Sequence, residues 1–286
     1  MQKSNRISGL VAALAIVLAG TLWAGMPLNS LDGCGGFVFN PLAYTGGHLL
    51  EGGPEWVTMP QVGAWYLKLP ASDVSWQSYS LSLTALDRIE LSYAANLVNA
   101  RKAGDSSILA HRVGAKLRLL DENLGDHAWV PAIAAGAVFR YTDSETTDLV
   151  GLDKSGFEYY IVASKLITQT PLAVMLSAGL QMSNEVAYGV FGHNDYGMGF
   201  FANADIFPIQ YVAVGVEFRQ GIKVGKIDAS DGKDIKNADY WDAHLAWFID
   251  EQLTFVAAYV YTGERDKSLD RLGLGHGFLI SGQYQF

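Results

Sequence analysis

The sequence ends with GHGFLISGQYQF at positions 275–286, and this stretch indicates the fold more directly than any other. Read as a β-strand, it alternates strictly between two faces. One face carries Phe278, Ile280, Tyr284 and Phe286, and the other carries Ser281, Gln283 and Gln285. A final amphipathic strand that ends in Phe is typical of bacterial outer-membrane β-barrels. The aromatic row is therefore predicted to face lipid and to serve as the membrane-insertion signal.

Eleven similar runs precede this one, each of roughly the ten residues that a tilted strand needs to cross a bilayer. We place the twelve strands at 61–69, 76–85, 88–96, 111–120, 129–141, 157–167, 172–184, 197–206, 211–221, 240–249, 253–262 and 275–286. Their even number is what a single-chain bacterial barrel requires. The sequence thus predicts an all-β fold, a transmembrane antiparallel up-and-down β-barrel of about 12 strands that follows a signal peptide.

The links between these strands alternate in length. Short links at 86–87, 121–128, 168–171, 207–210 and 250–252 alternate with mostly long polar links at 97–110, 142–156, 185–196, 222–239 and 263–274. Only the first link of the second set, at 70–75, is short. Short periplasmic turns and long outer loops are the pattern of outer-membrane barrels. With twelve strands, both ends of the barrel domain are expected on the periplasmic side.

Side-chain alternation predicts which face of the wall meets lipid. In the run 111–120, Val113 and Leu117 share one face, and the basic residues Arg112, Lys116 and Arg118 share the other. A charged side chain that faces lipid at the bilayer midplane costs about 2–4 kcal/mol. The basic face should therefore point into the barrel. A soluble barrel with the two faces reversed is the alternative that periodicity leaves open.

The N-terminal region carries an export signal. Lys3 and Arg6 precede an uncharged, mostly apolar stretch at 9–25, so residues 1–24 are predicted to be a cleaved signal peptide. The domains are then the signal peptide 1–24, a Gly-rich pre-barrel segment 25–60 and the barrel 61–286. The segment 25–60 either plugs the barrel or hangs as a periplasmic tail. The predicted location is the cell outer membrane of Gram-negative type.

Composition limits the chemistry. The chain has a net charge of −9, which argues against a nucleic-acid partner. Its single cysteine, Cys34, excludes an internal disulfide framework and a multi-cysteine zinc site. A free thiol is expected there, and lipidation is the alternative. We expect no cofactor and no metal. The expected partners are outer-membrane lipid, the barrel assembly machinery and periplasmic chaperones during biogenesis, and an unidentified small solute.

The interior is predicted to be basic. The assigned phase directs these residues into the lumen: Lys68, Glu90, Arg112, Lys116, Arg118, Arg140, Lys165, Asp205, Glu217, Arg219, Asp242 and His244. Basic pore linings favour anions. The main functional hypothesis is therefore a non-enzymatic, narrow, porin-like channel for small anionic or polar solutes. The opposing possibility is that these charges pair across the lumen and fill it.

Two other functions are kept open. A plugged barrel could act structurally or bind envelope partners. A barrel hydrolase would need catalytic side chains inside, and the closest pattern is Asp242 and His244, two residues apart on one strand face. An Asp-x-His pattern on a strand arises easily by chance. We therefore predict no catalytic residues.

Several phrases resemble one protein family. They are DRIELSYA at 87–94, WVP at 129–131 with Gly136 and Arg140, ASKL at 163–166, VGVEFR at 214–219, YWD at 240–242 with AWF at 246–248, and AAYV at 257–260. In this order they resemble the bacterial family catalogued as domain of unknown function 3034. The resemblance implies an outer-membrane β-barrel and supplies no activity. The Gly-rich segment that the family carries ahead of its barrel is matched loosely by residues 33–53.

Overall fold

The computed structural model describes residues 28–47, 49, 54, 56–101, 106–143, 152–223, 225, 236–264 and 271–286, so the predicted signal peptide at 1–24 lies outside the described residues. The strands are β1 (Gln61–Leu69), β2 (Val74–Ala85), β3 (Ile89–Ala100), β4 (Ser106–Leu120), β5 (Ala132–Asp143), β6 (Ser155–Ile167), β7 (Ala173–Val186), β8 (Phe191–Ile209), β9 (Val212–Arg219), β10 (Lys236–Asn237), β11 (Tyr240–Phe248), β12 (Leu253–Tyr261), β13 (Arg271–Leu272) and β14 (His276–Gln285). A short 3-10 helix, η2 (Leu124–Asp126), lies between β4 and β5.

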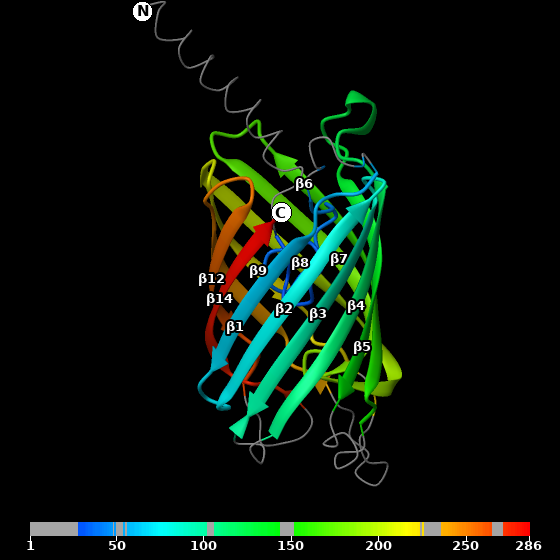
Figure 1. The fold of residues 1–286 in the computed structure, drawn as a ribbon, viewed down its shortest axis with the longest axis vertical. Helices are drawn as coiled ribbons and strands as arrows, with labels where there is room; N and C mark the ends of the chain where they lie inside the picture. Colours follow the sequence, from blue (N-terminus) through cyan, green and yellow to red (C-terminus); the bar gives the residue numbers. More distant parts are fainter. Residues whose placement is uncertain are drawn as a thin grey trace, which may run out of the picture.

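Twelve of these strands form a closed antiparallel barrel. Each pairs with its neighbour in the chain, and β14 closes the ring on β1, with Gln61 opposite Gln285 and Lys68 opposite Phe278. Figure 1 shows the strands steeply tilted around the barrel axis. The two short strands β10 and β13 pair with each other, in parallel, outside the ring. The predicted fold class is confirmed.

The predicted strands all exist, and the clearest difference concerns the link between β7 and β8. We predicted a long loop at 185–196, and the structure instead continues both strands into a tight hairpin whose turn spans 187–190. Val186 and Ile222 are buried and pack together, with Phe191 against them. This apolar contact stabilises the extended strands. The polar and glycine residues around it had led to the prediction of a loop.

Turn geometry agrees with the predicted short link at 86–87. The β2–β3 hairpin turns through Leu86 and Asp87, which have φ angles of 53° and 54°. Positive φ at both central residues is the conformation that matches the twist of paired strands. The C-terminus lies at the end of the barrel that carries this turn, and the β7–β8 hairpin lies at the other end (Figure 1).

The two faces of the wall are apolar outside and largely polar inside. On β4, Val113 and Leu117 are exposed, whereas Arg112 and Lys116 are buried. The reversed arrangement of a soluble barrel, with charged side chains outside, is therefore wrong for this chain. In the part of the chain that the structure describes, no helix is long and apolar enough to cross a membrane.

Residues 28–47 lie inside the ring of strands, and we call them the inner segment (dark blue in Figure 1). The segment folds back on itself through main-chain hydrogen bonds, such as Leu31 N to Val38 O at 2.8 Å and Leu42 N to Gly35 O at 3.0 Å. Its side chains Phe37 and Val38 are completely buried. Of the two arrangements left open for this region, these residues adopt the plug.

Candidate functional site in the barrel interior

The barrel interior receives most of the charged side chains that the sequence directs to it. Those on the inward face of their strands are Glu90, Arg112, Lys116, Arg118, Arg140, Asp205, Glu217, Arg219, Asp242 and His244. All are buried except Arg118, which lies near the β2–β3 turn and pairs with Asp87 at 2.6 Å. They come from two groups of adjacent strands, β3–β5 and β8, β9 and β11, which β6 and β7 separate.

Lys68 does not face the interior, and its assignment to the lumen is wrong. On β1 the inward residues are Trp65, Leu67 and Leu69, which pack in one cluster with apolar residues of the inner segment. Because this stretch of the inner face is apolar, the rule that polar residues point inward fails here. Lys68 projects outward at the rim and pairs with Asp73 at 2.9 Å.

Lys165 also belongs to the outward row. On β6 the outward residues include Phe157, Tyr159 and Ile161, and Lys165 has the same parity. Lys165 lies near the C-terminal end of the strand, and its long side chain reaches Glu122, with Nζ 2.8 Å from the carboxylate. The row that faces inward contains Glu158. Placing Lys165 in the lumen had assigned Glu158 to the outer face.

Three arginines of the interior form one network, which we call the arginine cluster: Arg112, Arg140 and Arg219. The Glu158 carboxylate accepts hydrogen bonds from Arg140, at 3.2 Å, and from Arg219. Glu185, at the end of β7, binds Arg140 as well. The guanidinium of Arg112 lies over the Trp76 ring, 5.4 Å from its centroid.

The inner segment supplies a further carboxylate to this cluster. Asp32 binds both Arg112 and Arg140, and its Oδ2 lies 2.8 Å from Arg140 Nη2. From the other side, the β7–β8 hairpin covers the cluster, since Arg112 donates to Tyr188 O at 2.9 Å. The arginine cluster is thus enclosed between the plug and the hairpin.

A second group of charges lies on β8, β9 and β11, and we call it the acidic cluster: Asp205, Glu217, Asp242 and His244. His244 bridges two carboxylates, with Nε2 2.8 Å from Asp205 and Nδ1 2.8 Å from Asp242. The bridge to Asp205 passes over Gly215, where a Cβ would lie 1.9 Å from Asp205 Oδ1, so glycine is required there. Phe37 of the inner segment stacks on the His244 ring at 4.8 Å.

Glu217 and Glu90 hold the inner segment through its main chain. Glu217 accepts hydrogen bonds from the N–H groups of Val38, Phe39 and Asn40. Glu90 accepts from the N–H groups of Gly35 and Gly46 and also pairs with Lys116 at 3.0 Å. Two carboxylates of the wall therefore anchor five amide groups of the plug.

The predicted net positive interior is not found in the described residues. Asp32, Glu158 and Glu185 all enter the arginine cluster, and sequence reasoning had placed none of them there. With the acidic cluster and Glu90, the interior carboxylates are at least as numerous as the cations. The opposing possibility was that the interior charges pair with one another and fill the lumen, and this is the arrangement that the structure shows. From the sequence, Glu158 could have been placed inside only by assigning the other face of β6 to the interior.

The space left between plug and wall is small. The cavity bounded by Asp32, Arg112, Arg140 and Tyr188 has a volume of about 20 Å³. A single water molecule needs roughly 10–15 Å³ of such space. This cavity therefore admits about one water molecule, and the arginine cluster is closed to solutes in this conformation.

Cys34 lies within the inner segment as a free, buried thiol. Its Sγ is 3.3 Å from Ser30 Oγ. Burial raises the pKa of the thiol above its ordinary value, because the thiolate would lose its hydration there. The structure thus places this thiol inside the barrel and keeps it protonated.

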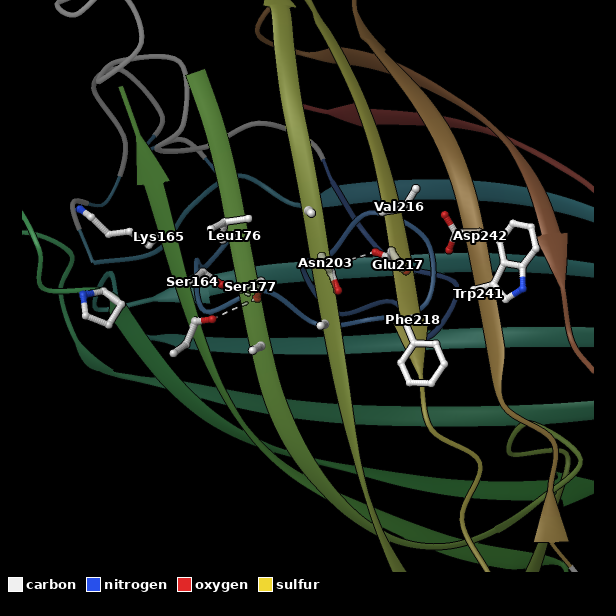
Figure 2. A pocket seen from close by; sticks show the side chains of 15 residues that line it. Ser164, Lys165, Leu176, Ser177, Asn203, Val216, Glu217, Phe218, Trp241 and Asp242 are labelled. Carbon is white, nitrogen blue, oxygen red and sulfur yellow. Dashed lines mark hydrogen bonds between the residues drawn. The ribbon is translucent and has the colours of Figure 1, made fainter. Parts of the chain in front are cut away.

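The outer wall carries the residues expected to meet lipid. Phe278, Ile280, Tyr284 and Phe286 are all exposed on its surface. Figure 2 shows how the wall separates two rows: Leu176, Phe218 and Trp241 project outward, while Ser164 bonds Ser177 and Asn203 bonds Glu217 on the inward side. The outward residues border a hollow of about 690 Å³, floored by small side chains such as Ala178 and Ala204. We expect acyl chains of lipid to fill it.

Among the residues that the structure describes, no group of three or more His, Cys, Asp or Glu side chains is arranged to hold a metal ion. The expectation of no metal and no cofactor stays a prediction. The Asp242–His244 pair has both ring nitrogens of His244 bound to carboxylates, so neither nitrogen is available to a nucleophile in this arrangement.

Comparison with known proteins identifies both a family and a fold. The family model described as protein of unknown function (DUF3034) matches residues 26–274. The NanC porin superimposes with a TM-score of 0.52 at 10% identity, covering 79% of this chain and 99% of that one. The KdgM porin gives a TM-score of 0.49 at 12% identity, with the same coverage of the two chains.

A third similar structure is the COG4313 outer membrane channel from Pseudomonas putida F1, with a TM-score of 0.48 at 13% identity, covering 81% of this chain and 95% of that one. No curated protein sequence shows significant similarity. At these identities, the likeness to porins establishes the outer-membrane barrel fold and nothing finer.

Proposed function

The chain belongs to the family described as protein of unknown function (DUF3034), and on this premise we propose that it is a porin-like conduit of the outer membrane that its own inner segment closes. The solutes would be small and anionic. They would pass only when the inner segment moves away from the arginine cluster.

The position of Asp32 carries this proposal. Its carboxylate lies between Arg112 and Arg140, where a carboxylate of a solute would bind. The inner segment is held there by hydrogen bonds, ion pairs and packing, with no disulfide to the wall in the described residues. When Asp32 leaves, two arginines lose a partner and gain a free side that faces the lumen.

Local charge, rather than the charge of the whole lumen, would set the selectivity. The closed interior has no excess of cations, so we expect no anion preference from its net charge alone. Displacement of Asp32 removes one negative charge from the arginine cluster and makes it locally positive. Rings of arginine and lysine favour anions in channels, which supports the choice of solute class.

A permanently plugged barrel with a structural or partner-binding role is the second candidate. The complete burial of Phe37 and Val38 favours it, because pulling both side chains into water would cost several kcal/mol. A catalytic role receives no such support, since His244 already bonds a carboxylate through each ring nitrogen.

Single-channel recording in planar bilayers separates the two candidates. We expect rare conductance steps from the full-length wild-type chain and more frequent ones from Asp32→Ala, which removes a buried ion-pair partner. An increase in open probability of about tenfold corresponds to roughly 1.4 kcal/mol and is the minimum expected. In a salt gradient, the reversal potential of Asp32→Ala should indicate anion preference, and adding Arg112→Gln should reduce it.

The matched control is Asp87→Ala, which removes one of the two carboxylate partners of Arg118, near the β2–β3 turn, and leaves the inner segment untouched. This variant should behave as the wild type does. A folded Asp32→Ala barrel that never conducts would favour the permanently plugged barrel. Conduction without anion preference would overturn the proposed solute class while leaving the conduit in place.

A further inference from the structure

The inner segment occupies the lumen as a ligand would, and the wall recognises it mainly by its peptide main chain. Besides the amides bound by Glu217 and Glu90, Asn29 N donates to Gln283 and Ala43 N donates to Ser164. Carbonyl groups are bound as well: Lys116 donates to Gly35 O and Tyr44 O. The wall therefore binds both kinds of peptide group, whichever side chains the peptide carries.

Two further interior residues bind carbonyls of the inner segment. Ser78 donates to Leu31 O at 2.9 Å, and Thr84 donates to Gly46 O at 2.6 Å. These donors lie on β2, whereas Glu217 and Ser164 lie on β9 and β6. Main-chain recognition thus extends around the inner face and does not depend on one strand.

The apolar part of the lumen accepts side chains. Leu31 packs in a cluster with Leu67, Leu69 and Trp76 of the wall. A peptide in the lumen would therefore find hydrogen-bonding partners for its main chain and apolar surface for its side chains, together with a carboxylate site at Arg112 and Arg140.

The fit of the inner segment leaves wall groups unused. Among the described residues, Arg112 Nε, Arg140 Nε, Asp205 Oδ2 and Asp242 Oδ2 are buried and have no hydrogen-bond partner. Buried polar atoms without partners are costly, so an occupant that satisfied them would compete well with the inner segment. These groups belong to both charged clusters, which face the same occupied space.

We propose that the solutes of this conduit are short peptides with a free C-terminal carboxylate, bound by the wall as it binds its own inner segment. This proposal rests on the proposed conduit and names its substrate class. The carboxylate would replace Asp32 at Arg112 and Arg140. Peptide N–H groups would replace those of residues 38–40 at Glu217.

Block of the ion current tests the proposal on full-length Asp32→Ala, in which the arginine site is open. The probes are tetraglycine, tetraglycine with an amidated C-terminus, and propionate. We expect tetraglycine to block at a concentration about tenfold or more below that of either other probe. Adding Glu217→Gln should weaken block by both peptides and preserve the advantage of the free carboxylate. Adding Arg140→Gln should remove that advantage.

Val216→Ala in the same background is the matched control, because Val216 neighbours Glu217 on β9 and faces outward. It should leave peptide block unchanged. Block by propionate as strong as that by tetraglycine would overturn the peptide proposal and leave an anion conduit. Conductance steps that no peptide blocks would overturn it too. A folded Asp32→Ala barrel without any steps would instead contradict the conduit itself.

A second measurement uses the wild-type chain, so its result cannot be affected by a variant that fails to fold. A peptide that competes with the inner segment should release it and expose Cys34 to a thiol reagent. We expect tetraglycine to accelerate modification of Cys34 several-fold, and propionate to have little effect. Equal modification rates with and without peptide would contradict the proposal.

Discussion

Asp32 Oδ2 accepts a hydrogen bond from Arg140 Nη2 at 2.8 Å, across 108 residues of sequence. This contact joins the inner segment to the wall at the centre of the arginine cluster. Because Arg112 binds the same carboxylate, removing Asp32 changes both the plug and the lumen charge. The predictions below follow from this coupling and from the orientation of the two faces of the wall.

Cys34 should react slowly with thiol reagents in the native barrel. Burial raises the pKa of its thiol, and each unit of increase lowers the thiolate fraction about tenfold at a given pH. Modification should therefore be slow at pH 8 in detergent micelles and rapid after unfolding in urea. It should also be faster in Asp32→Ala than in Asp87→Ala. Rapid modification of the native wild type would place Cys34 outside the barrel.

The raised pKa of the Cys34 thiol also predicts how the inner segment responds to pH. Since the pKa in the folded protein is raised, the protonated thiol stabilises the seated segment fully below the ordinary pKa of 9.0. That stabilisation is lost as the pH rises above 9.0 towards the raised value. Channel openings should therefore become more frequent in strongly alkaline buffer, and Cys34→Ser should show a smaller increase. An identical response in the two proteins would contradict this cause.

The buried pair of Glu90 and Lys116 should be important for stability. Glu90→Gln leaves the Lys116 ammonium buried without its charge partner, which costs about 3–5 kcal/mol. Replacing both residues, as Glu90→Gln with Lys116→Met, should recover much of this loss. Urea unfolding followed by tryptophan fluorescence measures both effects. Lys68→Ala, at an exposed pair, should change the unfolding free energy by about 0–1 kcal/mol.

A larger loss of stability in Lys68→Ala than in Glu90→Gln would contradict the assignment of Glu90 to the interior and of Lys68 to the outer face. If Lys68→Ala destabilised the barrel as much as Glu90→Gln, the inward and outward rows of β1 or β3 would have been misassigned. Because Glu90 also binds Gly35 and Gly46, part of the Glu90→Gln effect should appear as easier release of the inner segment.

Val214→Arg tests the lipid-facing row of β9. Val214 lies near the middle of an outward row, where an arginine facing acyl chains would cost about 2–4 kcal/mol. The fraction of barrel that resists unfolding in cold SDS should fall, whereas Val214→Leu should behave as the wild type does. Unchanged folding of Val214→Arg in lipid would mean that this row does not face acyl chains.

Sequence patterns predicted the wall better than they predicted its contents. On β4 and β9, basic and acidic residues alternate with aliphatic ones, and both phases were read correctly. On β1 and β6 the only cation lies near a strand end, where it can reach a carboxylate at the rim. Assigning Lys165 to the lumen reversed the phase of β6 and concealed Glu158.

The inner segment was harder to place because its contacts are made by peptide groups. Glu217 binds three amides in residues 38–40, and any sequence would offer amides of this kind. Asp32 has no nearby partner in the sequence, since Arg112 and Arg140 follow on distant strands. The choice between plug and tail therefore required the structure.

The most direct test of the whole account is a reversible lock on the inner segment. Ala43 N donates to Ser164 Oγ at 2.9 Å, which keeps the two Cα atoms within about 7 Å, the limit for a disulfide. The variant Ala43→Cys/Ser164→Cys/Cys34→Ser should give no conductance steps when oxidised. Steps should appear in the same bilayer after a reductant is added. Equal conductance before and after reduction would contradict a plug that opens.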